Sequence, residues 1–527
     1  MIPITDSRQA AEAKYAIEQA MLDDTPWTLL LGETSIAVNR RNCEWSVEWG
    51  KLIFAWWDEQ HSQSWRVTAY AVEDAELIFQ ATRGMGRELA TLTLRQQQRW
   101  REKVETEELE LPEQRRSYAQ LLARLLGAPS PRAATEAEPA PSAPARYARV
   151  KIKQGREIIL AIGACAAESQ AGIDGVIAAG LVWLADFNQR RAAGGRPNRK
   201  ANRLRFCLPA GRAQTAIERL TLLNASRLDA RLECVEVDER SEALTGVQLA
   251  AQDELLNAHP RELKWPASAP PENPWRERIV RLAPELIEVR QLAERESYAI
   301  HGLEFARWSG GETARATFGV AGLHGENQTA EPTRLSEASF PRLESLVREI
   351  VAHRSAGARD RRHPFYRLRE EAWLESLLRR NIRALDATFD ERFVYSQIPA
   401  WRGEERSVID LLTVKWEPGQ APRLAVIEIK ASEDAQLPLQ GLDYWLRVEQ
   451  ARLRGEFARR GLFPGVQLAD RPPLLYLVAP RLRFHRTFAT VARCLSPRIE
   501  AYQVGVNLNW RAGVRVHSIE RINAPDE

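Results

Sequence analysis

Between residues 27 and 95, short apolar runs alternate with polar residues and are separated by turn-forming residues. Alternation with a period of two is typical of strands that bury one face, so this region is predicted to be an antiparallel meander or a small sandwich. The first twenty residues predict a short amphipathic helix, and a helical pattern follows the strands over about 95–126. Together, residues 1–127 are predicted to form a β-rich N-terminal domain with a helical arm.

Five tryptophans accompany these predicted strands: Trp45, Trp49, Trp56, Trp57 and Trp65. Indole rings on one face of a sheet can stack on nucleobases or hold a ligand. Aromatic residues at strand spacing more often fill a core, however, because they bury a large apolar area. We therefore expect these residues to be part of the domain core.

Two proline-rich segments divide the middle of the chain. Residues 128–146 are rich in Ala, Pro, Ser and Glu, which predicts a flexible linker, and 265–275 form a shorter break. Residues 147–262 show alternating helix and strand patterns and are predicted to form an α/β domain. Residues 263–360 mix strand patterns with one helix, which predicts a mixed α/β connecting domain. We identify no catalytic set of residues in either region.

The last region, 361–527, has the sharpest pattern. Apolar residues recur at helical spacing over 365–386, and three strand-like runs follow. A second helix over 437–457 precedes a fully apolar strand at 474–479, and a further helix and strand complete the region. This order predicts a mixed sheet with helices on both sides. The whole chain is accordingly predicted to be a multidomain α+β and α/β protein.

A predicted hairpin in this region places charged residues together. Its turn is centred near Pro418 and Gly419, two residues that favour turns. If the strands pair symmetrically about position 419, Asp410 lies opposite Glu428, and Lys430 lies on the same face two residues later. The opposite face then carries four apolar residues suited to a core: Ile409, Leu411, Ile427 and Ile429.

Two buried carboxylates side by side destabilise a fold unless something neutralises them. A divalent cation does so, and carboxylate ligands favour Mg²⁺ or Mn²⁺. The alternative is an exposed strand pair joined by a Glu–Lys ion pair, which the apolar flanking strands disfavour. Only nine of the 74 basic residues are lysine, so a lysine at this position is notable.

The order of these residues resembles a known family: Asp410, Glu428, Ile429 and Lys430 on strands, then Gln440 and Tyr444 on the next helix. The pattern is similar to that of the PD-(D/E)XK nuclease superfamily, and the QxxxY element resembles its RecB-type branch. The resemblance covers roughly 365–510. Ile409 stands where the family name has proline, a position that varies within the superfamily.

The resemblance implies a role for each matching residue. Asp410 and Glu428 would bind Mg²⁺ or Mn²⁺ with help from the Ile429 carbonyl, and Lys430 would position or activate the attacking water and stabilise charge on the phosphate. Gln440 and Tyr444 would face the active site. The family often adds a glutamate from the first helix, where Glu375 is the preferred candidate over Glu371.

These implications predict an Mg²⁺-dependent deoxyribonuclease whose N-terminal domains recognise substrate, partner or signal. Defence against foreign DNA and DNA repair are suggested by analogy only. The alternative is a catalytically silent nuclease fold that binds nucleic acid or protein. DNA is favoured over RNA as the partner, and a protein partner or a homo-oligomer is left open.

Charge and composition change this picture only slightly. The net charge is +3, but residues 361–527 hold 27 basic against 21 acidic residues, or +6, which leaves −3 for the remainder. A local basic excess is a weak indication of a phosphate-rich partner. The five cysteines are scattered, without metal-binding spacing, which favours buried thiols in a reducing cytoplasm. The sequence shows neither a secretory signal nor an apolar run that would span a membrane.

Overall fold

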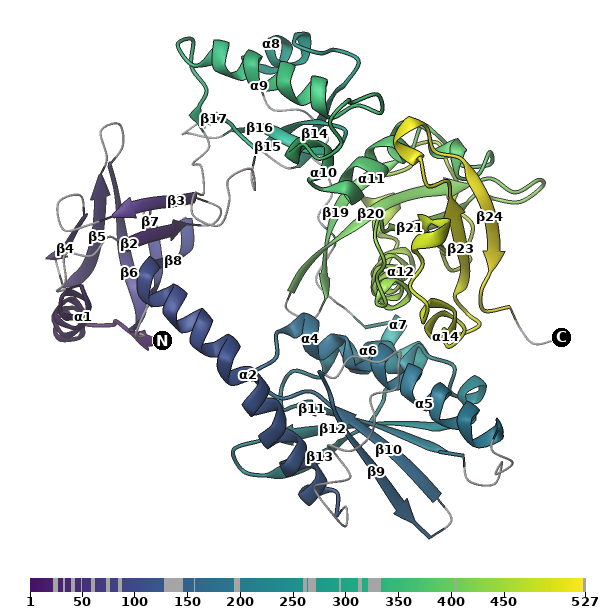
Figure 1. The fold of residues 1–527 in the computed structure, drawn as a ribbon. Helices are drawn as coiled ribbons and strands as arrows, with labels where there is room; N and C mark the ends of the chain where they lie inside the picture. The colour runs from purple at the N-terminus through teal and green to yellow at the C-terminus, as the bar shows by residue number, and fades with distance from the viewer. Residues whose placement is uncertain are drawn as a thin grey trace. The chain divides into compact units, whose positions relative to one another are not determined.

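The structure is a computed structural model with four β-sheets, distributed over two compact units, Met1–Gln114 and Arg115–Glu527 (Figure 1). It describes all residues except 22–26, 32–33, 39–42, 49, 58–61, 73–75, 84–87, 128–145, 156, 194–199, 259–262, 264–271, 293–294, 311–314, 321–332, 403–404 and 525–527. The linker predicted at 128–146 therefore lies outside the described residues except at Arg146, and so does most of the break predicted at 265–275. The expectation of a multidomain protein with mixed helices and sheets is confirmed.

The first unit is an antiparallel sheet of eight strands. Seven follow the order β3-β2-β8-β7-β6-β5-β4, and β1 pairs with β6. Its elements are β1 (Ile2–Pro3), α1 (Ser7–Ala20), β2 (Trp27–Leu31), β3 (Thr34–Val38), β4 (Cys43–Glu48), β5 (Lys51–Trp57), β6 (Ser62–Val72), β7 (Glu76–Arg83) and β8 (Glu88–Gln96). The predicted meander is thus confirmed. Trp45, Trp56 and Trp65 are buried in its core as expected, while the side chains of Trp49 and Trp57 lie outside the described residues.

A long helix, α2 (Gln97–Leu125), leads into the second unit, where the Tyr118 hydroxyl donates a hydrogen bond to the Cys207 carbonyl (3.0 Å). The sheet there has the order β13-β12-β11-β10-β9, with β10, β11 and β12 parallel. Its elements are β9 (Ala148–Gln154), β10 (Glu157–Gly163), α4 (Gln170–Asp174), α5 (Val176–Ala193), β11 (Arg203–Pro209), α6 (Gln214–Thr221), β12 (Arg231–Asp238), β13 (Ala243–Val247) and α7 (Gln252–Leu256). The helical stretch Gln170–Ala192 is apolar and long enough to cross a membrane, but it is mostly buried in this core.

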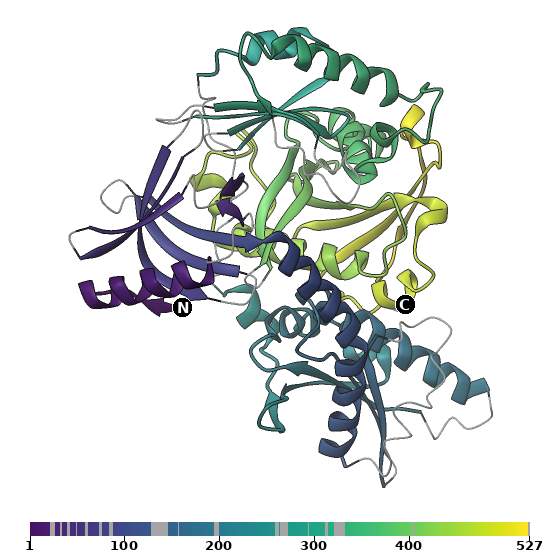
Figure 2. The same cartoon turned by 60° about the vertical axis from the view of Figure 1, so that its left-hand side comes forward.

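The third sheet is antiparallel in the order β14-β15-β16-β17-β18, and α9 lies across one of its faces (Figure 2). Its elements are α8 (Arg276–Arg281), β14 (Ile287–Leu292), β15 (Arg295–Ile300), β16 (Leu303–Ser309), β17 (Arg315–Phe318), β18 (Thr333–Arg334) and α9 (Phe340–His353). Strand β14, which the sequence pattern did not predict, is the one that faces the next domain.

The fourth sheet is mixed, with the order β19-β20-β21-β22-β23-β24. Pairs β19–β20, β20–β21 and β23–β24 are antiparallel, while β21–β22 and β22–β23 are parallel. Its elements are α10 (Pro364–Arg367), α11 (Glu370–Arg380), β19 (Tyr395–Arg402), β20 (Glu405–Lys415), β21 (Arg423–Ile429), α12 (Leu437–Leu453), α13 (Glu456–Arg459), β22 (Leu474–Pro480), α14 (Phe488–Ala492), β23 (Glu500–Val506) and β24 (Val516–Arg521). The predicted helices and strands form this sheet, and β24 is an edge strand that was not predicted.

The two faces of this sheet belong to different cores. Trp373 of α11 packs with Leu411, Ile427 and Ile429 on one face, whereas α12 packs on the other. Ile409 was predicted to share the first of these faces, and that prediction is wrong because its side chain belongs to the core around α12. The β19–β20 ladder skips the pair Gln397 and Asp410, and Gln397 has φ 54°, so the strands are irregular between Ile409 and Leu411.

The α12 face also packs against the α/β sheet of residues 147–262, and the two share a single hydrophobic core. Backbone hydrogen bonds join them directly, from Asn224 N–H to the Cys494 carbonyl (2.7 Å) and from Ser496 N–H to the Leu222 carbonyl (2.9 Å). The sequence pattern did not predict this interface. It fixes α12 between two sheets.

Candidate active site

The hairpin of β20 and β21 sets the geometry of the site. Its turn closes through a hydrogen bond from Gln420 N–H to the Glu417 carbonyl (3.1 Å), and Gly419 adopts φ +71°, which a residue with a Cβ adopts only with strain. Paired residues from Leu411 and Ile427 onward are symmetric about position 419, so the predicted register is confirmed. Extending that register by one residue sets position 410 opposite 428.

The structure brings the three predicted central residues together at the end of β21. Asp410 Oδ2 accepts a hydrogen bond from the Ile429 N–H (2.9 Å). Lys430 Nζ donates to Glu428 Oε1 (3.0 Å). The carboxyl groups of Asp410 and Glu428 are close enough for each to affect the pKa of the other. Two acids and one ammonium group therefore meet at one point of the sheet.

Burial dominates the electrostatics of this cluster. Burial raises the pKa of Asp410 despite the nearby Lys430 charge, and burial raises the pKa of Glu428, with the charge of Asp410 adding to the effect. Burial by itself would lower the pKa of Lys430, but the carboxylates of Glu428, Glu371 and Asp410 outweigh it and raise that pKa. Without a cation the acids therefore favour a shared proton, while Lys430 remains an ammonium group.

One oxygen of the cluster lacks a donor. Glu428 Oε2 is buried, and among the described residues no N–H or O–H group donates to it. Its neighbour is the Asp410 carboxyl, with which it can bond only by sharing a proton. A buried acceptor without a partner costs about 1–3 kcal/mol, so a cation at this position would be stabilising.

The donor set fits a small hard cation. The carboxylates of Asp410 and Glu428 and the carbonyl of Ile429 are oxygen ligands of the kind that Mg²⁺ and Mn²⁺ prefer. Within the described part of the chain, no group of three or more His, Cys, Asp or Glu side chains is placed to hold an ion. The two carboxylates would thus leave coordination positions for water and substrate oxygens, as is usual for Mg²⁺.

A pocket of about 490 Å³ opens beside the cluster. It is lined by α11, β19, β20 and the segment after β21, through Arg369, Glu370, Glu371, Ala372, Glu375, Gln397, Asp410, Ala431 and Ser432. Glu371 is half-exposed at this pocket, and its Oε2 lies 3.7 Å from Lys430 Nζ. The pocket gives a ligand access to Asp410 from the α11 side.

Glu375, the preferred additional acid, lies in the same pocket but already has two partners. Gln397 Nε2 donates to its Oε2 (2.8 Å), and an Arg290 guanidinium nitrogen lies 3.4 Å from its Oε1. Burial raises the pKa of Glu375 to about 7, although Arg290 opposes the shift. Glu375 and Glu371 are both placed near the cluster. Of the two, the structure gives only Glu371 a contact with Lys430.

The predicted QxxxY pair lies on α12. Gly441 allows this helix to approach the sheet closely, because a Cβ at that position would lie 2.5 Å from the Leu477 side chain. Burial raises the pKa of Tyr444, and the charges of Glu428 and Asp410 raise it further, which places the phenol near the acids. Gln440 Oε1 is buried and has no hydrogen-bond partner among the described residues.

The sequence did not indicate the residues of α6 that form ion pairs with α12. The Arg219 guanidinium donates two hydrogen bonds to Asp443, at 3.0 and 2.8 Å, and a third to the Asp174 carbonyl (2.8 Å). Arg447 of the same helix pairs with Glu218. Asp443 lies inside the QxxxY element, but its partner is 224 residues away, so no local pattern could have indicated the pair.

A second network that the sequence did not indicate joins α11 to β14 of the third sheet. Glu288 of β14 accepts hydrogen bonds from the Ser376 hydroxyl and from Arg379 (2.7 Å). Arg290 of the same strand reaches Glu375. The sequence pattern of β14 carried no signal for these contacts, because charged residues on a short strand usually face solvent.

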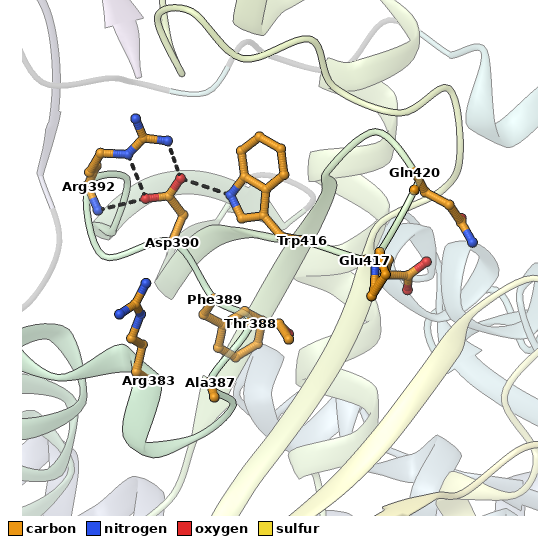
Figure 3. A pocket seen from close by; sticks show the side chains of 11 residues that line it. Arg383, Ala387, Thr388, Phe389, Asp390, Arg392, Trp416, Glu417 and Gln420 are labelled. Carbon is orange, nitrogen blue, oxygen red and sulfur yellow. Dashed lines mark hydrogen bonds and ion pairs between the residues drawn. The ribbon is translucent and has the colours of Figure 1, made fainter.

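A larger cavity, of about 750 Å³, lies at the other end of the β20–β21 hairpin (Figure 3). Its polar groups satisfy one another: Asp390 accepts hydrogen bonds from Arg392 (2.7 Å) and from the Trp416 indole (3.0 Å). These contacts lower the pKa of Asp390, with Arg392 as the main cause. A paired carboxylate has no need of a cation, so the smaller pocket beside Asp410 is the better candidate active site despite its size.

No protein-family model, curated protein or solved structure matches this chain.

Proposed function

We propose that this chain is a metal-dependent nuclease of the PD-(D/E)XK type that hydrolyses phosphodiester bonds in DNA. The observation that carries the proposal is the convergence of Asp410, which accepts from the Ile429 N–H at the pocket, and the buried Glu428, which accepts from the Lys430 ammonium group. The buried Glu428 oxygen without a donor supports it. A soluble, cytoplasmic setting agrees with five buried cysteines that form no disulfide.

Asp410, Glu428 and the Ile429 carbonyl would hold Mg²⁺ or Mn²⁺. When bound, such an ion lowers the pKa of a coordinated water and offsets negative charge that develops on the phosphate. The two carboxylates are already fixed, Asp410 by the Ile429 N–H and Glu428 by Lys430, so little reorganisation is needed to hold the ion.

Lys430 acts in this proposal as a donor and not as a base. Its surrounding carboxylates raise its pKa, so the ammonium form persists at neutral pH. A compact ammonium group can orient the attacking water and donate to a non-bridging phosphate oxygen. The side chain is mostly buried, which strengthens both interactions relative to those in water.

Glu371 and Glu375 form the wall of the pocket on the α11 side. Glu371 is placed to balance the charge of Lys430, and Glu375 is held by Gln397 and Arg290. On α12, the phenol of Tyr444 senses the charges of both acids, and Gln440 has a buried amide oxygen without a partner among the described residues. In this proposal these two side chains orient groups at the site.

The test is incubation of the purified full-length protein with linear duplex, circular and single-stranded DNA in Mg²⁺, Mn²⁺ or EDTA. We expect cleavage with either metal and none with EDTA, and no cleavage by an Asp410→Ala variant. DNA binding without cleavage under every condition would instead support the catalytically silent binding protein. Equal cleavage by Asp410→Ala would place the chemistry elsewhere.

A further inference from the structure

A segment rich in arginine, residues 359–369, leads directly into α11 and the pocket. It contains five arginines and one aspartate, a formal charge of +4 over eleven residues. All five arginines are exposed: Arg359, Arg361, Arg362, Arg367 and Arg369. Arg369 also lines the pocket together with Glu371 and Asp410. We call residues 359–369 the arginine segment.

The arginines of this segment are unpaired. In the part of the chain that the structure describes, none of their side chains has an ion pair or a hydrogen bond, and Asp360 accepts a bond from the Arg362 backbone instead (2.8 Å). Other arginines of the same unit face carboxylates, as Arg203 does with Glu233 and Arg452 with Glu449. The charge of the segment is therefore available to a ligand.

The second half of the segment is held in place by the fold. Arg354 is buried, and its guanidinium donates to the carbonyls of Phe365 and Leu368 (2.7 Å each) and of Arg369 (3.2 Å). Phe365 packs in the core of the third sheet, whereas Tyr366 packs in the core around α11. A chain anchored on both sides presents its side chains with little loss of backbone entropy on binding.

We propose that the arginine segment is the docking surface for the sugar–phosphate backbone of the nucleic acid strand that enters the pocket. Arg369, at the pocket wall, contacts phosphates beside the cleaved bond, and the other four arginines contact the strand further along. Guanidinium groups suit phosphate oxygens because they donate two parallel hydrogen bonds. This inference rests on the proposed nuclease function.

The rival ligand is an acidic protein surface. The placement of the segment favours nucleic acid, because its last arginine lines the same pocket as Asp410 and Glu371. A docking surface that ends at the carboxylates guides a phosphate toward the Lys430 ammonium group. An acidic protein would instead bring more carboxylates to a site that already holds several.

The test measures binding separately from cleavage. Full-length protein carrying Asp410→Asn is titrated in EDTA against fluorescein-labelled duplex DNA, single-stranded DNA, RNA and polyglutamate, by anisotropy at several salt concentrations. One variant adds Arg359→Gln, Arg361→Gln, Arg362→Gln and Arg367→Gln. The matched control instead adds Arg240→Gln, Arg315→Gln, Arg342→Gln and Arg459→Gln, four exposed arginines that do not line the pocket. Both sets change the charge by the same amount.

We expect the segment variant to bind at least one of the nucleic acids more weakly. The slope of log K against log salt should become shallower by about 0.9 for each lost duplex contact, or about 0.7 on a single strand. The control should keep the parental slope. Equal slopes for the two variants, or a loss confined to labelled polyglutamate, would overturn the proposal. If the wild type binds through this segment but cleaves nothing, the nuclease function fails while the docking surface stands.

Discussion

Two adjacent residues of α12, Asp443 and Tyr444, belong to two charge clusters of different composition. Asp443 faces Arg219, and the pair has one positive and one negative group joined by two hydrogen bonds. Tyr444, the next residue, lies near Asp410 and Glu428, where two carboxyl groups share one ammonium partner. The first cluster is electrically balanced with both groups ionised, whereas the second would have an excess of negative charge if both acids were ionised.

The difference separates a structural ion pair from a candidate binding site. A balanced pair with satisfied donors has nothing left to bind, so its removal should change stability alone. An unbalanced buried pair of acids is destabilising unless a cation joins it, so it is retained where the cation is used. Predictions for the two clusters should therefore diverge, with activity changed at one and stability at the other.

The largest loss of cleavage activity is expected when Lys430 is replaced. Replacing it with alanine should lower cleavage about 10⁴-fold, or about 5.5 kcal/mol, because charge stabilisation and water positioning are lost together. Lys430→Arg should fail as well, since a planar guanidinium does not replace a compact ammonium group. The matched control is Lys415→Ala on the same hairpin, where Lys415 pairs with Asp386 (2.6 Å). Single-turnover kinetics measure all three, and normal cleavage by Lys430→Arg would make this lysine structural.

The next largest effect is a loss of stability when the ion pair of Arg219 and Asp443 is broken. Arg219→Met leaves the Asp443 carboxylate buried without its partner and should lower the free energy of unfolding by about 3–5 kcal/mol. Adding Asp443→Leu should restore much of that loss, because no unpaired charge then remains. Urea denaturation measures both variants. If the double variant folds stably but has lost all cleavage, the pair has a role in the site and the contrast drawn above is wrong.

Two acids, Glu375 of α11 and Glu288, which bonds to α11, should change the free energy of unfolding with pH in opposite directions. Burial raises the pKa of Glu375 to about 7, so its contribution to stability is full below about pH 4.5 and is lost as the pH rises through 7. The loss amounts to about 3 kcal/mol in the metal-free protein. The pKa of Glu288 is lowered: burial opposes the shift, but Arg379 outweighs it, so its contribution is lost as the pH falls.

Unfolding free energies measured from about pH 3 to 8 in EDTA test this contrast. Relative to the wild type, Glu375→Gln should flatten the decline toward high pH, whereas Glu288→Gln should flatten any decline toward low pH. The same pH dependence in the wild type and in Glu375→Gln would show that Glu375 is not the acid responsible.

The smallest effect is expected at Tyr444. Tyr444→Phe keeps the ring and removes the hydroxyl, so cleavage should fall by about tenfold or less, the value of one hydrogen bond. Tyr502→Phe is the matched control, because its hydroxyl donates to Glu500 on β23, away from the acids. A loss as large as that of Lys430→Ala would require a direct chemical role for the phenol.

The sequence predicted the parts of the site that depend on local rules. A turn at Pro418 and Gly419 determines the register of the hairpin, and the register sets Asp410 opposite Glu428. The helix bearing Gln440 and Tyr444 followed from periodicity in the same way. Each of these inferences uses residues fewer than thirty positions apart.

The remaining features depend on contacts between distant segments. Arg219 and Asp443 are separated by 224 positions, and Arg290 and Glu375 by 85, so no periodicity links them. The face of the sheet on which Ile409 lies was also not predictable. The strands are irregular beside it, where Gln397 has a left-handed backbone that a non-glycine residue rarely adopts. The two partners of Glu375, Gln397 and Arg290, were likewise not predictable from the sequence.

The proposed nuclease function requires above all that Asp410 and Glu428 bind a divalent cation. Calorimetric titration of the full-length protein with Mn²⁺ at pH 6, in two buffers of different ionisation enthalpy, tests it most directly. Because both acids have raised pKa values, we predict a single binding site with release of protons, lost in Asp410→Asn and retained in Asp386→Asn. Equal Mn²⁺ affinity for the wild type and Asp410→Asn, or no binding by either, would contradict the account.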